Sequence, residues 1–151
     1  MEKKRNIKKG TALLTVLICL TISGCGESSK DQIITIYDYS ENKLNEYDTN
    51  NKEIDDLVNS ICDYLLDEDG ETVEIPKDAL NDKRIEVFQG NKNKSVDQQK
   101  TNENRLISIE IYKDSSELYC KAYFSFSEQE YSTKLPADIT KQVEELEISQ
   151  K

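Results

Sequence analysis

Apolar and polar residues alternate along residues 105–135, and this is the clearest pattern in the chain. Alternation of this kind predicts half-buried β-strands. A two-residue turn at Asp114 and Ser115 would place every apolar pair of the first hairpin on one face. The expected pairs are Ile111 with Leu118, Ile109 with Cys120, and Ile107 with Ala122. A second turn, at Ser127 and Glu128, would add a third strand ending near Leu135, although it sets Lys121 against Lys134.

Earlier in the chain, residues 50–65 show helical spacing of their apolar positions instead. Asn50 is expected to cap a helix, with Glu53 three positions later as in a capping box. Apolar residues then recur three and four positions apart: Ile54, Leu57, Val58, Ile61, Cys62 and Leu65. Near the end of the chain, Pro136 suits the first turn of a final helix. Its apolar stripe is narrow and consists of Ile139, Val143 and Leu146.

β-branched and aromatic residues predict further strands at 33–39 and 84–88, with a weaker strand at 44–47. Residues 67–83 are acidic and include Gly70 and Pro76, so mostly loop is expected there. Residues 90–104 are almost entirely polar and predict a long mobile loop. The expected fold is α+β: a small antiparallel sheet of four to five strands, one helix packed on a face, and a C-terminal helix.

The first 25 residues carry a different pattern. A basic cluster precedes an apolar run at 12–20, which is too short to span a membrane and is typical of a secretory signal. The signal ends in Ile22-Ser23-Gly24-Cys25, which resembles the lipobox of bacterial lipoproteins. The resemblance implies cleavage before Cys25 and a diacylglyceryl group on its sulfur. Two acyl chains suffice for stable anchoring.

This reading divides the chain into a signal peptide at 1–24, a lipidated Cys25 with a tether to residue 31, and one ectodomain at 32–151. The ectodomain is expected on the extracytoplasmic side of the cell membrane. Residue usage rich in Lys, Asn, Ile and Glu is typical of a Gram-positive source. Removing residues 1–24 takes away five of the 20 basic residues and one of the 30 acidic ones, which leaves a net charge of −14. Such a chain should be repelled by nucleic acid and by anionic lipid headgroups. Its membrane contact is therefore expected through the lipid alone.

Composition also limits catalysis. The chain has no His, which excludes Ser-His-Asp and Cys-His machinery, and its five Gly form no phosphate-binding loop. The acidic run before Gly70 fails as a calcium loop because Leu65 and Pro76 would occupy ligand positions. Acidic pairs such as Asp55-Asp56 fall on expected solvent faces. No catalytic residue, metal or cofactor is therefore expected.

Cys62 and Cys120 both fall on expected core faces, one on the helix and one on the sheet. Two interpretations stay open: buried thiols that pack as small apolar groups, or a disulfide, which is plausible outside the cell.

The other face of the expected hairpin carries Tyr112, Tyr119 and Tyr123. In the expected register, Tyr119 lies opposite Glu110 and Tyr123 opposite Leu106. Either the final helix or residues 40–51 cover this face, or it binds an unknown protein or peptide. The leading hypothesis is a non-catalytic binding module on a lipoprotein. The alternatives are an immunity-type lipoprotein that sequesters a cationic peptide and, less favoured, a hydrolase.

Overall fold

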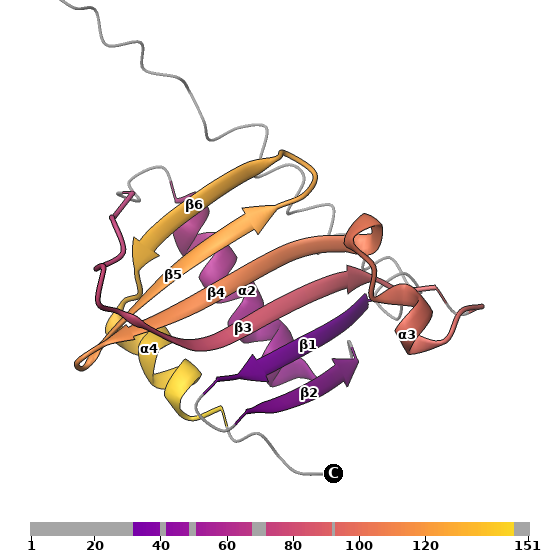
Figure 1. Cartoon of the computed structure of the whole chain (residues 1–151), viewed down its shortest axis with the longest axis horizontal. Helices are drawn as coiled ribbons and strands as arrows, with labels where there is room; N and C mark the ends of the chain where they lie inside the picture. Colours follow the sequence, from indigo (N-terminus) through magenta and orange to yellow (C-terminus); the bar gives the residue numbers. More distant parts are fainter. Residues whose placement is uncertain (1–31, 40–41, 49–50, 68–71, 92, 147–151) are drawn as a thin grey trace, which may run out of the picture.

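The computed structural model describes residues 32–39, 42–48, 51–67, 72–91 and 93–146 (Figure 1). The predicted signal peptide, Cys25 and the tether lie outside the described residues.

One antiparallel sheet organises the described part of the chain. It has six strands in the order β2-β1-β3-β4-β5-β6. Their bounds are β1 Gln32–Asp38, β2 Lys43–Asp48, β3 Leu80–Gln89, β4 Arg105–Asp114, β5 Glu117–Phe124 and β6 Gln129–Lys134. The α+β class is confirmed, but the expected count of four to five strands is too low. The weak segment near residue 44 pairs fully with β1, and β3 begins at Leu80, inside the segment expected to be mostly loop.

Two helices cover one face of this sheet. Helix α2 (Lys52–Leu66) runs across the strands, and α4 (Ala137–Glu144) packs beside it on the same side (Figure 1). Alternate strand residues meet the helices in a single core, in which Ile36, Ile61 and Ile109 are fully buried. The core therefore lies between one face of the sheet and α2, with α4 closing one side.

The helix boundaries differ slightly from the sequence prediction. Asn51, not Asn50, caps α2, and its Oδ1 accepts a hydrogen bond from the backbone N–H of Ile54. Pro136 is the N-cap of α4 rather than its first helical residue. Helix α2 buries all six expected apolar residues and α4 buries Ile139 and Val143, because the helical period does not change when the first residue shifts by one. Leu146 lies beyond the end of α4 and is only partly buried.

Both hairpin turns lie at other residues than the sequence predicted. Ile111 lies opposite Cys120, and Asp114 opposite Glu117, so the first turn is Ser115-Ser116. In the second hairpin, Phe124 lies opposite Gln129. These registers place Lys121 opposite Glu110 and bring it to an ion pair with Glu130 at 3.1 Å. The observed register therefore avoids the repulsion between Lys121 and Lys134 that the predicted one contained.

The polar segment at 90–104 contains regular structure instead of an unbroken loop. It forms the short helix α3 (Val96–Gln99) and a 3-10 turn, Asn102–Asn104. Ser95 and Gln98 form a complete capping box at the start of α3. Gln99 is buried, and its side-chain amide donates to the Lys94 carbonyl at 2.6 Å while its carbonyl accepts from Asn91 N–H. A buried glutamine thus supplies the interior contacts that the segment lacks in apolar residues.

The cap of α2 can be tested with two substitutions. Asn51→Ala should lower the free energy of unfolding by about 1 kcal/mol, because the Ile54 N–H loses its side-chain acceptor. Asn51→Asp keeps an acceptor oxygen and should stay close to the wild type. Urea unfolding followed by circular dichroism measures both, and equal losses would contradict this assignment of the cap.

Candidate binding face

The face of the sheet opposite α2 and α4, here called the outer face, carries the three tyrosines singled out in the sequence. Tyr112, Tyr119 and Tyr123 alternate with the core residues of β4 and β5 and so point away from the helices. Helix α4 does not cover them, because Ile139 and Val143 turn its apolar stripe into the core. Residues 43–48 do not cover them either, since they form edge strand β2 in the plane of the sheet (Figure 1). Neither α4 nor the described part of residues 40–51 therefore covers these tyrosines as expected.

The tyrosines differ in exposure. Tyr112 and Tyr119 are direct cross-strand partners, and Tyr119 is only 8% exposed. Tyr123 lies opposite Ser108 and Glu130 and is 36% exposed. The expected neighbours Glu110 and Leu106 were wrong because the first turn lies one residue further on. Of the three, Tyr123 offers the most surface to a partner.

Connecting segments shield both ends of the outer face. The connection from α2 to β3 passes β6, where the Val73 N–H donates to the Ser132 carbonyl and the Ser132 hydroxyl donates to the Val73 carbonyl. It then crosses in front of the β4–β5 hairpin, on the side away from α2 (Figure 1). At the opposite end, Lys100 from the segment after α3 pairs with Glu46 of β2. Phe88 is 5% exposed there although it lies outside the main core.

The middle of the outer face is held by paired charges. Arg105 donates to the Glu86 carboxylate at 3.1 Å, and Nε of Arg84 lies 3.9 Å from the same oxygen. The Arg84 guanidinium also lies 5.8 Å from the ring centre of Tyr37. Arg84 therefore combines a half-exposed guanidinium with an aromatic contact, a pairing common at interface hot spots.

Hydrogen bonds hold two of the tyrosines in place. The Tyr112 hydroxyl donates to Glu110 at 2.5 Å, and the Tyr119 hydroxyl donates to Glu117 at 2.9 Å. Burial, followed by the hydrogen bond and charge of Glu110, raises the pKa of Tyr112 to about 12. Both phenols are thus kept neutral, and their rings are held against the sheet.

Cys62 and Cys120 are buried and unbonded, one on α2 and the other on β5. Burial raises the pKa of each thiol to about 12, and for Cys62 the charge of Asp63 adds to the effect. A thiolate is the reactive form, so neither thiol is suited to act as a nucleophile. The structure has the arrangement of two packed thiols rather than the alternative disulfide.

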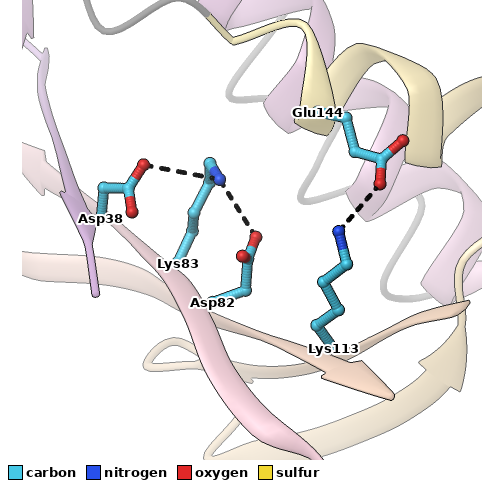
Figure 2. Close-up of polar contacts among 5 residues, drawn as sticks. All are labelled: Asp38, Asp82, Lys83, Lys113 and Glu144. Atoms are coloured by element: carbon cyan, nitrogen blue, oxygen red, sulfur yellow. Dashed lines mark hydrogen bonds and ion pairs between the residues drawn. The ribbon is translucent and has the colours of Figure 1, made fainter. Parts of the chain in front are cut away.

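Sequence reasoning missed a charged cluster at the end of the helix-covered face (Figure 2). Lys83 is 8% exposed and lies between Asp82, at 3.0 Å, and Asp38, at 3.6 Å. A break in register between β3 and β4 leaves Asp82 without a partner on β4, which lets successive residues share this cluster. Nearby, Lys113 of β4 pairs with Glu144 of α4 at 3.2 Å. The one sequence signal for this lysine is strand periodicity: Lys83 lies two residues before Ile85, so both side chains point to the same, helix-covered face.

The contacts of this cluster favour a structural role. A buried lysine with two carboxylates is stable only while its partners remain, since an unpaired buried charge costs several kcal/mol. The carboxylates Asp38 and Asp82 already contact this lysine. Among the residues that the structure describes, no group of three or more Cys, Asp or Glu side chains could hold a metal ion.

No protein-family model, curated protein or solved structure matches this chain. Among the described residues, none of the helices is long and apolar enough to cross a membrane. The outer face therefore has to be interpreted from its own geometry.

The buried state of the two thiols predicts their reactivity. In the folded chain, Cys62 and Cys120 should react with iodoacetamide far more slowly than in urea, because both are buried and neutral. Peptide mass mapping distinguishes them from the other two cysteines. Fast labelling of either residue in the native chain would contradict its placement in the core, and no labelling in urea without a reductant would indicate a disulfide.

Proposed function

We propose that this chain is a lipid-anchored extracytoplasmic protein of a Gram-positive cell, and that its ectodomain binds a protein or peptide partner without catalysis. The observation that carries the binding role is the outer face. It lies opposite both helices, and it carries the Arg84–Tyr37 contact between β3 and β1 together with the exposed Tyr123 on β5.

Two physical features support binding at this face. Tyr and Arg provide large contact areas together with hydrogen-bonding groups, and both are enriched among residues that dominate binding energy. The ion pairs with Glu86 restrain Arg84 and Arg105, and the hydrogen bond to Glu110 restrains Tyr112, before a partner arrives. Such restraint reduces the entropy lost on binding.

The anchor rests on the sequence alone. Ile22-Ser23-Gly24-Cys25 resembles a lipobox, and the basic and apolar segments before it have the order of a secretory signal. A net charge of −14 on the mature chain would keep the domain away from anionic headgroups, so that the lipid is the sole membrane contact. In that arrangement the outer face is free to meet a partner in the extracytoplasmic space.

The same acidity motivates the second candidate, an immunity-type lipoprotein that captures a cationic peptide. Long-range attraction would accelerate the encounter, and added salt would reduce the rate. The identity of the captured partner separates the two candidates: a cationic peptide favours the second, and a neutral or acidic protein favours the first.

The anchor predicts a defined effect of one substitution. Cys25→Ser should abolish labelling by an alkyne fatty acid and prevent cleavage at this site, because the sulfur that would carry the diacylglyceryl group is gone. Labelling in growing cells, followed by gel analysis of membrane and soluble fractions, measures both effects. Wild-type protein that takes no label would contradict the lipoprotein assignment.

The binding face can be tested with a photoreactive phenylalanine analogue placed in the full chain. At Tyr123 it should cross-link a discrete partner in living cells, because this side chain is exposed on the outer face. The matched control is the same analogue at Asp56, an exposed position on α2 on the other side of the molecule. Mass spectrometry identifies the adducts. Equal cross-linking at both positions, or none at Tyr123, would remove the outer face as the binding surface.

A further inference from the structure

The two edges of the sheet are not equivalent. On β6 the outward side is partly bonded, since Val73 exchanges two hydrogen bonds with Ser132. On β2, the other end strand, no described segment pairs with the side that faces away from β1. An edge of this kind presents a row of backbone donors and acceptors to another strand.

Two side chains in the middle of β2 lack a packing or hydrogen-bonding partner: Leu44 is an exposed apolar residue, and Asn45 has an unpaired amide nitrogen. Leu44 lies on the outer face and is 53% exposed. Its neighbour Asn45 lies on the helix-covered face, opposite the fully buried Ile36. The side-chain nitrogen of Asn45 is buried and has no hydrogen-bond partner. A buried amide donor without an acceptor costs about 1–3 kcal/mol, so a rotation of the amide that brings this donor to an acceptor on a partner chain would be stabilising.

We propose that β2 pairs antiparallel with β2 of a second copy of this chain, about a twofold axis that passes beside Asn45. A twofold axis perpendicular to a sheet keeps each face on its own side and sets one residue opposite itself. With Asn45 on the axis, the two Asn45 side chains lie on the same face as direct neighbours. An amide carries both a donor and an acceptor, so each Asn45 can donate to the other, as a self-complementary interface requires.

The same register accounts for Leu44. It places Leu44 opposite Glu46 of the second copy, and the two Leu44 side chains become diagonal neighbours on the outer face, within reach of each other. Glu46 is already paired with Lys100 of its own chain, which lessens the cost of bringing it to the interface. One arrangement thus pairs the edge that no described segment occupies, supplies the missing acceptor and buries the exposed leucine.

Charge gives this dimer a recognisable salt dependence. The chain has a formal net charge of −10, so two copies repel each other at long range. Salt screens that repulsion and leaves the backbone hydrogen bonds largely unchanged. Self-association through β2 should therefore strengthen as ionic strength rises, whereas an association driven by ion pairs would weaken.

Oxidative cross-linking of the full chain in membranes tests the proposed axis. Residues opposite each other in antiparallel strands have Cα atoms about 4.5–5.5 Å apart, which suits a disulfide. In Asn45→Cys, copper phenanthroline with oxygen as the electron acceptor should oxidise the two introduced thiols to one intermolecular disulfide, releasing two protons. The measured quantity is the dimer on a non-reducing gel, and wild type gives the background from the native cysteines.

The matched control is Asp56→Cys, which places a thiol at an exposed position of α2 away from the edge. Asn45→Cys should give a several-fold higher dimer yield than this control. Adding Leu44→Glu to Asn45→Cys should lower the yield toward background, because each new carboxylate would lie directly opposite Glu46 of the second copy. Equal yields from Asn45→Cys and Asp56→Cys, or no effect of Leu44→Glu, would overturn the proposal.

Sedimentation of the detergent-solubilised wild-type chain gives a second measurement that does not depend on a folded cysteine variant. A dimer whose population rises with protein concentration and with salt is expected. A monomer at every concentration and ionic strength would overturn the proposal, and so would a dimer that dissociates as salt is added.

Discussion

The packing of α2 against one face of the sheet is the interaction on which the rest of the structure depends. Fully buried residues of β1, β3, β4 and β5 meet Leu57, Ile61 and Cys62 in one core. Since strand side chains alternate between faces, burying one set against the helix exposes the other set. The helix thus determines which residues form the outer face, although it does not contact them.

The same alternation explains how far the sequence could be interpreted. The facing of β4 and β5 was predicted correctly, because a register error of two residues returns every side chain to the same face. The turn itself was not, since Asp114-Ser115 and Ser115-Ser116 are both acceptable in composition. In the observed register Lys121 lies opposite Glu110 on β4 and forms an ion pair with Glu130 on β6, instead of facing Lys134. Such cross-strand pairs become visible only after a register has been chosen.

The candidate site was predictable in a similar, partial way. Periodicity alone placed Cys62 and Cys120 in the core and the three tyrosines outside it. It could not indicate that Tyr119 would be only 8% exposed, because side-chain exposure depends on neighbours that are distant in the sequence. It also could not indicate the ion pairs of Lys83, which depend on a local break in the β3–β4 register. Long-range placement of irregular segments is where single-sequence reasoning ends.

The connection between α2 and β3 has a consequence for the order of folding. Its hydrogen bonds join Val73 to Ser132, which is 59 residues further along the chain. Closing so long a loop costs entropy that local contacts do not repay, and such contacts tend to slow folding. During synthesis or secretion, Val73 must wait until β6 has emerged and paired with β5. Until then the outward edge of β6 lacks the two hydrogen bonds that Val73 supplies, so a chaperone that acts on this protein would meet an open strand edge.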